Sequence, residues 1–249
     1  MYALKIDNVC KSYRARGRVT LAAEDVSFYV NEGECVGLLG MNGAGKSTVV
    51  KICTGLISAD GGSVSVFGHD MSSDPENAKK HLNVSPQETA VAGNLTVREN
   101  LELISRMYGA DKAQARRAAE RITEALRLGD KSVERAKKLS GGLMRRLSIG
   151  MALITEPKLV FLDEPTLGLD VVARRELWRY IKALRPHTAA VLTTHYLEEA
   201  ESLCDRIVIM KKGKVAATGT AEELKAQSKS DSFEQAFLRI TGEEDGYDE

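Results

Sequence analysis

Gly40-Met41-Asn42-Gly43-Ala44-Gly45-Lys46-Ser47 follows a short apolar run, Cys35–Leu39, and precedes a helical pattern from Ser47 to Thr54. The pattern G-x-x-x-x-G-K-[ST] between a strand and a helix predicts a phosphate-binding loop. The glycines let backbone N–H groups turn toward one anionic centre, and the helix N-terminus adds partial positive charge. Lys46 is expected to reach the β- and γ-phosphates, and Ser47 to offer its hydroxyl to Mg²⁺. The sequence therefore predicts that the chain binds a nucleoside triphosphate.

Charge and cysteine usage narrow the possible partners and location. Lys plus Arg and Asp plus Glu balance at 35 each over 249 residues, so no overall positive field favours nucleic acid or an anionic membrane. The scattered cysteines lack metal-ligand spacing and are expected to be reduced, mostly buried thiols of a cytosolic protein: Cys10, Cys35, Cys53 and Cys204. No signal pattern and no apolar run of about 18 residues is visible, so any membrane role is expected to need a partner.

Apolar periodicity predicts strands at both ends of the chain. Leu4–Val9 and Leu21–Val30 are expected to be strands around a turn at Arg14–Arg18. Later strand patterns alternate with helical ones, which predicts a parallel sheet with crossover helices. The other expected strands are Cys35–Leu39, Ser63–Phe67, Leu82–Ser85, Leu159–Leu162, Ala190–Thr193, Arg206–Met210 and Val215–Ala217, and the later helices are Val171–Leu184 and Tyr196–Leu203.

Helical spacing replaces strand spacing between about Gln87 and Pro157, which predicts a helical insertion in an α/β domain. Three apolar stripes are expected to be core faces: Leu101, Ile104 and Tyr108; Ala115, Ala119, Ile122 and Leu126; and Leu143, Leu147, Met151 and Ile154. From Gly242 onward the chain is rich in Asp and Glu and is expected to be disordered.

Two carboxylates follow the all-apolar strand Leu159–Leu162. A buried strand presents Asp163 and Glu164 at its carboxyl end, where ligands bind in α/β folds. Asp163 is expected to hold Mg²⁺, and Glu164 to orient and polarise an attacking water. The alternative is a surface acidic pair at the start of a loop, which the upstream phosphate loop disfavours. The pair therefore predicts hydrolysis as well as binding.

Leu139-Ser140-Gly141-Gly142-Leu143 adds a second candidate anion site, because a Ser N-cap and two glycines expose N–H groups at a helix start. With this motif the sequence resembles the nucleotide-binding subunits of ABC transporters, and the resemblance extends over residues 1 to about 240. It implies an α/β, P-loop NTPase (RecA-like) parallel-sheet core with an N-terminal antiparallel β subdomain and an inserted helical subdomain. The implied division is an ATP-binding core (1–86 and 158–220), a helical signature subdomain (87–157), and a C-terminal helix with an acidic tail (221–249).

The resemblance also implies roles for single residues. Tyr13 is similar to the residue that stacks on adenine. Gln87 is similar to the loop glutamine that touches Mg²⁺ and the attacking water, and His195 to the switch histidine at the γ-phosphate. The implied catalytic residues are Glu164, His195 and Gln87, and the implied metal ligands are Ser47, Gln87 and Asp163. The implied nucleotide contacts are Tyr13, Gly40, Asn42, Gly43, Ala44, Gly45, Lys46, Ser47, Thr48, Ser140, Gly141, Gly142 and Asp170, the last from the loop Gly168-Leu169-Asp170 that resembles a dimer-interface loop.

The family pairs two subunits head to tail, with each ATP between the phosphate loop of one chain and the signature motif of the other. The resemblance thus implies ATP and Mg²⁺ as ligands, and as partners a second nucleotide-binding subunit and a separate transmembrane permease, with no nucleic acid. The implied location is the cytoplasmic face of the plasma membrane, through that permease. Leu143 stands where much of the family has Gln, and Met41 where Pro is common. Arg145-Arg146 and Ser232–Leu238 resemble the branch that exports drugs, ions, lipids or glycans.

Two other functions compete with a transport motor. A non-transport ABC ATPase would act as an ATP-switched regulator on ribosomes or DNA, but such relatives usually carry two fused ATPase units or long coiled-coil inserts. A solitary small-molecule kinase would leave Leu139–Gly142 and His195 without a role. The sequence therefore favours an ATPase that dimerises and drives a separate membrane protein, whose cargo the subunit itself does not touch.

Overall fold

A six-stranded sheet forms the centre of the computed structural model, which describes residues 1–15, 18–184 and 186–243. Its strand order is β10-β9-β3-β8-β7-β6, and neighbours run parallel except for β10, which forms a hairpin with β9. The strands are β3 (Cys35–Leu39), β6 (Leu82–Ser85), β7 (Leu159–Asp163), β8 (Ala189–Thr194), β9 (Arg206–Lys211) and β10 (Lys214–Gly219). The predicted bounds of β3 and β6 are confirmed. Every residue of β3, β7 and β8 is buried, as expected for parallel strands covered on both faces.

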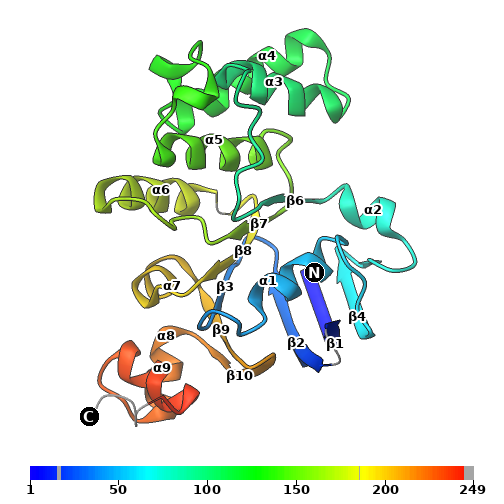
Figure 1. Cartoon of the computed structure of the whole chain (residues 1–249), viewed down its shortest axis with the longest axis vertical. Coiled ribbons are helices and arrows are strands. Elements are labelled where there is room, and N and C mark those ends of the chain that lie inside the picture. The colour runs from blue at the N-terminus through cyan, green and yellow to red at the C-terminus, as the bar shows by residue number, and fades with distance from the viewer. Residues whose placement is uncertain (16–17, 185, 244–249) are drawn as a thin grey trace.

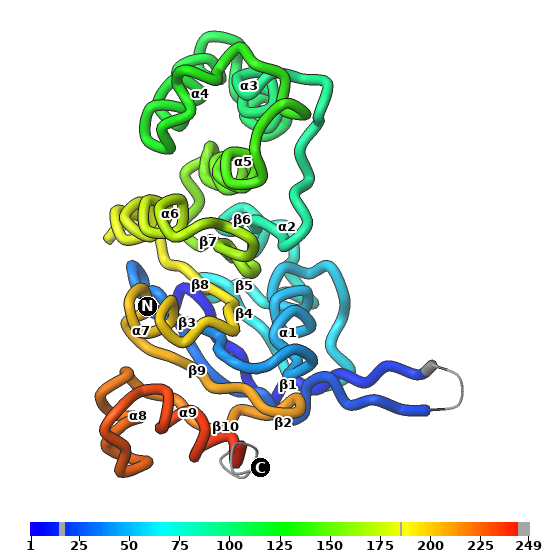
Figure 2. The backbone as a smooth tube through the Cα atoms, turned by 60° about the vertical axis from the view of Figure 1, so that its left-hand side comes forward, coloured from blue at the N-terminus to red at the C-terminus, as the bar shows by residue number. Residues whose placement is uncertain are grey.

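A four-stranded antiparallel sheet in the order β2-β1-β4-β5 packs beside it: β1 (Tyr2–Ala15), β2 (Arg18–Asn31), β4 (Gly61–Val66) and β5 (His69–Asp70). The predicted turn at Arg14–Arg18 is wrong in its extent, because the ladder continues to the pair Ala15 and Arg18. The part of the turn at residues 16–17 lies outside the described residues. The hairpin projects from the molecule in Figure 2, and its described outer residues Tyr13, Arg14 and 18–21 are exposed, so they lack the apolar alternation that marks a half-buried strand.

The helices cover both faces of the parallel sheet and fill the insertion (Figure 1). Those of the core are α1 (Lys46–Cys53), α2 (Pro75–Lys79), α6 (Val171–Ala183) and α7 (Leu197–Leu203). Those of the helical subdomain are α3 (Val97–Met107), α4 (Lys112–Ala125) and α5 (Gly141–Leu153), with short 3₁₀ turns at Gly129–Lys131 and Ala136–Lys138. Capping boxes at Thr96 and Asp111 fix the starts of α3 and α4.

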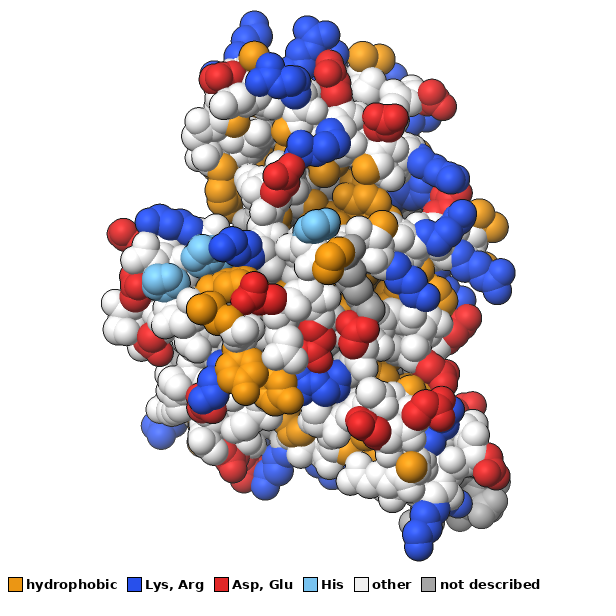
Figure 3. Space-filling model, turned by 180° about the vertical axis from the view of Figure 1, so that it is seen from behind, with side chains coloured by type: hydrophobic (Ala, Val, Ile, Leu, Met, Phe, Trp, Pro, Cys, Tyr) orange, Lys and Arg blue, Asp and Glu red, His pale blue; other side chains and the backbone are white. Residues whose placement is uncertain are grey.

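The helical subdomain joins the sheet through α5, because one apolar cluster contains Leu101 of α3, Leu147 of α5 and Leu162 of β7. The predicted stripe on α4 is confirmed as a core face, since all four of its residues are buried. The prediction that Tyr108 is a core residue is wrong: it ends α3 with 62% of its surface exposed, and only its hydroxyl reaches inward, to Asn83 Oδ1 at 3.0 Å. Figure 3 shows hydrophobic side chains gathered in the hollow where this subdomain meets the core.

The C-terminal part contains two helices where the sequence predicted one, α8 (Ala221–Ser228) and α9 (Phe233–Thr241). Lys229 ends α8 in a left-handed conformation, with φ of 54°, so the chain turns before Ser232 caps α9. The predicted disordered tail begins at Gly242, which caps α9, and its residues 244–249 lie outside the described residues. Of the cysteines expected to be mostly buried, Cys35 and Cys53 are buried, and Cys10 and Cys204 are partly exposed. Within the described ranges, no helix combines the length and apolar composition needed to cross a bilayer.

Candidate nucleotide-binding site

A cleft of about 370 Å³ opens where the phosphate loop meets the carboxyl ends of the parallel strands. Because β3, β6, β7 and β8 are parallel, the segments that follow them emerge at one sheet edge. Predicted residues that line the cleft are Asn42, Gly43, Ala44, Gly45, Lys46, Ser47, Thr48, Gln87, Glu164 and His195. Residues that the sequence analysis did not single out also line it: Thr20, Leu21, Ala22 and Leu167.

The phosphate loop needs its glycines for shape. Gly45 has φ of 105° and ends the loop as the N-cap of α1, and a Cβ there would lie 2.3 Å from the Ala22 carbonyl oxygen. Gly40 does not line the cleft, but a Cβ on it would lie 2.5 Å from the Met210 carbonyl oxygen. Gly43, with φ of 81°, would meet nothing within 4 Å. The loop is therefore packed on its protein side and open on its cleft side, where an anion would bind.

Lys46 is a buried cation at the base of the loop. Its Nζ donates to the carbonyl oxygens of Gly40 at 2.6 Å and Met41 at 3.3 Å, and lies 3.6 Å from Glu164 Oε1. Burial lowers the pKa of Lys46, and the carboxylates of Glu164 and Asp163 partly offset that effect. An ammonium in this position would gain from the additional negative charge of a phosphate.

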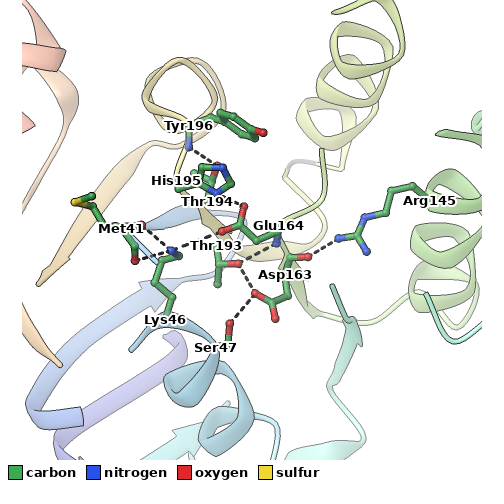
Figure 4. A network of polar contacts seen from close by, with 11 residues as sticks. Met41, Lys46, Ser47, Arg145, Asp163, Glu164, Thr193, Thr194, His195 and Tyr196 are labelled. Atoms are coloured by element: carbon green, nitrogen blue, oxygen red, sulfur yellow. Dashed lines mark hydrogen bonds and ion pairs between the residues drawn. The ribbon is translucent and has the colours of Figure 1, made fainter. Parts of the chain in front are cut away.

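Asp163 lies beside Ser47 and Thr193 (Figure 4). Its Oδ1 accepts a hydrogen bond from Thr193 Oγ at 2.5 Å and lies 3.5 Å from Ser47 Oγ. Thr193 also accepts a hydrogen bond from the Glu164 N–H at 2.9 Å. The sequence analysis gave Thr193 no role, although it is the residue of β8 that pairs with Asp163 of β7. The pairing of β7 with β8, which side-chain patterns do not reveal, determines this placement.

Glu164 and His195 approach each other across the cleft from β7 and β8. His195 Nδ1 lies 2.9 Å from Glu164 Oε2, and the Glu164 side chain is buried. Glu164 has φ of 48°, a left-handed conformation that is uncommon for a residue with a side chain. Backbone conformations of this kind persist where surrounding contacts hold them and are frequent at active sites. The pair can therefore orient a small polar molecule next to the phosphate loop.

Tyr13 lies at the margin of the cleft and does not line it. It is 42% exposed, and its cross-strand partner in the β1–β2 ladder is Thr20, which does line the cleft. The extended hairpin thus brings the segment Thr20–Ala22 to the site. The sequence analysis missed this segment because it placed the end of the hairpin too close to the core.

The second anion-site motif and the Asp170 loop form a separate surface. Ser140 caps α5 by accepting a hydrogen bond from the Leu143 N–H at 3.4 Å, and Asp170 caps α6 by accepting one from the Ala173 N–H at 2.9 Å. A Cβ on Gly142 would lie 3.6 Å from Leu169, so the two loops are neighbours, and Gly141 faces open space. Among the described residues, the cleft lining includes none of these.

Comparisons with known proteins identify the family and several relatives. The family model described as ABC transporter matches residues 23–167. The doxorubicin resistance ATP-binding protein DrrA of Mycobacterium tuberculosis is 40% identical, over 93% of this chain and 69% of the relative. The Nod factor export ATP-binding protein I of Rhizobium etli is 38% identical, over 90% of this chain and 70% of the relative. A dimeric, post-hydrolysis structure of an ATP-binding cassette bound to ADP and phosphate superposes with a TM-score of 0.80 at 26% identity, over 87% of this chain and 98% of that one.

Thr193→Val should destabilise the site at nearly constant side-chain volume. The valine leaves the Asp163 carboxylate without its hydroxyl donor and the Glu164 N–H without that acceptor. Losing such partners costs about 1–3 kcal/mol. Urea unfolding should show this loss, while the matched control Thr218→Val, at an exposed position of β10, should unfold like the wild type. Equal midpoints for the wild type and both variants would contradict this account.

Proposed function

This chain belongs to the ABC transporter family, and from that premise we propose that it powers export by a separate transmembrane permease. It is the ATP-binding subunit, and it hydrolyses ATP in a reaction coupled to transport. One observation carries the proposal: the cleft gathers Lys46, Glu164 and His195, whereas the Ser140 motif lies on another, exposed surface. Such a division suits a nucleotide that is bound by one copy and covered by a second.

For hydrolysis, Glu164 is the proposed residue that orients and polarises the attacking water. His195 fixes the Glu164 carboxylate through its 2.9 Å contact and is the proposed contact to the γ-phosphate. Lys46 and the N–H groups of the phosphate loop stabilise the charge on the phosphates. Gln87 reaches the same cleft from the end of β6 and is the proposed second contact to the water. Tyr13, at the margin, is the proposed stacking partner of the adenine.

Mg²⁺ is the proposed metal, and the oxygens at the cleft fit it. Ser47 Oγ and Asp163 Oδ1 lie 3.5 Å apart, and hydroxyl, carboxylate and phosphate oxygens are the ligands that Mg²⁺ uses. Among the described residues, no group of three or more His, Cys, Asp and Glu side chains could hold a metal by itself. The proposed ligands are therefore Ser47, Asp163 and Gln87, together with the nucleotide. When bound, the ion would neutralise phosphate charge.

A second copy of this chain is the proposed partner across the nucleotide. Ser140 and Gly141 are exposed at the N-terminus of α5, so their N–H groups can face the phosphates held by the other copy. Asp170 lies beside them, in position to contact the same interface. Leu143, which stands where much of the family has Gln, packs against the helical core and is assigned no nucleotide contact.

The permease is proposed to contact the helical subdomain on the cytoplasmic side of the plasma membrane. α3 exposes the large apolar side chains of Leu103 and Met107, followed by Tyr108, and such a patch suits a protein partner. Hydrophobic side chains also gather where the subdomain meets the core (Figure 3). Export is favoured because one relative is named for Nod factor export and another for doxorubicin resistance.

Glu164→Gln should abolish turnover and keep ATP binding. The amide cannot take up a proton from water, whereas the phosphate loop is unchanged. Steady-state phosphate release should fall by roughly 10²-fold or more, the low end of what general-base removal costs. The dissociation constant for ATP, measured by calorimetry on the same sample, should stay within about twofold. Turnover at the wild-type rate would reject the assignment of Glu164.

Ser140→Arg should prevent ATP-dependent dimerisation, because its side chain would occupy the place proposed for the partner's phosphates. The test uses Glu164→Gln as the background, so that bound ATP persists. Analytical ultracentrifugation with ATP and Mg²⁺ should show a dimer for the background and a monomer for the double variant. Ser58→Arg adds the same side chain at another exposed serine and should still dimerise. An unchanged dimer in the Ser140→Arg variant would exclude the head-to-tail arrangement.

A membrane companion should copurify with the tagged chain and stimulate its ATPase activity. The chain is captured from detergent-solubilised membranes of its own host, and the eluate is tested for a polytopic membrane protein in stoichiometric amount. Adding that protein back in lipid vesicles should raise phosphate release several-fold, as expected when the two are coupled. Stoichiometric capture of ribosomes or DNA without a membrane protein would instead support the regulatory alternative.

A further inference from the structure

Arg145, on the second turn of α5, is a buried cation that the proposed reaction does not yet use. Its side chain comes from the helical subdomain, yet it reaches the core, and only 4% of the residue is exposed. Its guanidinium donates hydrogen bonds to four backbone carbonyl oxygens. They belong to Pro86 at 2.5 Å, Gln87 at 3.2 Å, Pro165 at 3.0 Å, and Asp163. Figure 4 shows the bond to Asp163.

These acceptors lie in the two segments that carry the proposed water-positioning residues. Pro86 and Gln87 follow β6 and lead into the helical subdomain. Asp163 and Pro165 stand immediately before and after Glu164. Arg145 therefore holds the carbonyl oxygens of the residues before and after Glu164 and, with the same guanidinium, that of Gln87.

The backbone at Glu164 requires such support. Its φ of 48° is a conformation that costs on the order of 1–3 kcal/mol unless neighbouring contacts compensate. Thr193 binds the Glu164 N–H, and Arg145 binds the carbonyl oxygens on each side. The direction of the Glu164 side chain into the cleft depends on this backbone, because a relaxed φ would turn the carboxylate elsewhere.

We propose that Arg145 is a positioning residue that locks Gln87 and Glu164 into one arrangement and ties that arrangement to the signature helix α5. This inference rests on the proposed roles of Gln87 and Glu164. Arg145 lies five positions after Ser140, which corresponds to about 7.5 Å along a helix. A shift of α5 caused by closure of the partner on Ser140 would therefore reach the hydrolytic residues of the same chain. A second contact also joins α5 to the strand that precedes Gln87, because Ser148 Oγ of α5 lies 3.2 Å from Ser85 Oγ of β6.

Only arginine suits this position. A guanidinium is a rigid plane with five N–H donors, so it can bridge carbonyls of two separate segments. A lysine ammonium carries the same charge on a single donor atom and cannot reach both sides at once. Burial lowers the pKa of Arg145, and the nearby charges of Asp163, Glu199 and Glu164 oppose that effect, so the cation is stabilised by the site that it positions.

The test compares Arg145→Lys and Arg145→Gln with the wild-type chain. We expect kcat for ATP hydrolysis to fall by on the order of 100-fold, as for displacement of a catalytic group by about 1 Å. The ATP dissociation constant should stay within about twofold, because the phosphate loop is untouched. The control is Arg127→Lys, whose ion pair with Glu176 at 3.0 Å lies at the surface, and it should keep the wild-type kcat. Thermal unfolding of each variant shows which samples are folded.

A folded Arg145→Lys variant with kcat within twofold of the wild type would overturn the inference. If neither variant folds, nitrogen-15 NMR of the wild-type arginine side chains decides. The Arg145 guanidinium should show hindered rotation and hydrogen exchange at least tenfold slower than exposed Arg127, as its four acceptors require. Exchange as fast as that of Arg127 would also overturn the inference.

The outcomes separate this inference from the proposed function. Wild-type turnover in Glu164→Gln would remove the role of Glu164, whatever Arg145 does. An inactive Glu164→Gln together with a fully active Arg145→Lys would leave the ATPase assignment intact and reject only the positioning role.

Discussion

The register of the central parallel strands is the constraint on which the site depends. β8 pairs with β7 so that Thr193 stands opposite Asp163, and with β3 so that Thr194 stands opposite Leu39. The phosphate loop, the acidic pair and His195 therefore all start at the same height on one sheet edge. A shift of one residue in either pairing would turn side chains to the opposite face of the sheet and separate these groups. The apolar runs of β3, β7 and β8 do not oppose such a shift by themselves, because both faces of these strands are buried. The hydroxyl contacts of Thr193 with Asp163 and Glu164 do oppose it, because a shift would break them.

The buried charges near this edge balance one another. Lys46 and Arg145 are cations, Asp163 and Glu164 are carboxylates, and all four are buried. Isolated charges in such a position would be strongly unfavourable. Each cation is largely satisfied by backbone carbonyl oxygens, Lys46 by those of the phosphate loop and Arg145 by those around Gln87 and Glu164. The carboxylates instead contact side chains, Asp163 those of Thr193 and Ser47, and Glu164 that of His195. The hydrogen bonds that satisfy the buried cations also fix the backbone of the site, so the same contacts contribute to stability and to the geometry of the site.

Sequence patterns predicted the parts of the structure that depend on local chemistry. The phosphate loop followed from its glycines, Lys46 and the flanking strand, and the bounds of β3 and β6 followed from short apolar runs that end at Gly40 and Pro86. Features set by distant pairing could not be predicted in this way. The outer half of the β1–β2 hairpin has no buried face, Tyr108 uses only its hydroxyl to bind Asn83, and the role of Thr193 depends on the order of β7 and β8. Arg145 looked like a family marker because its carbonyl partners leave no trace in side-chain patterns.

The arrangement of the two anion-binding surfaces argues for a nucleotide site completed by a second chain. In one copy, the Gly43 face of the phosphate loop opens into the cleft, while Gly141 faces open space near the Asp170 loop and does not line the cleft. Within one molecule the two surfaces are held apart, since α5 is anchored to β6 through Asn83 and to the segment after β6 through Arg145. The same anchoring connects the surface at Ser140 to the segments that carry Gln87 and Glu164. Under the proposal, a displacement of the N-terminus of α5 is carried through Arg145 to the backbone around Gln87 and Glu164. In the proposed mechanism, closure of a partner on Ser140 and the positioning of Gln87 and Glu164 are therefore coupled through α5.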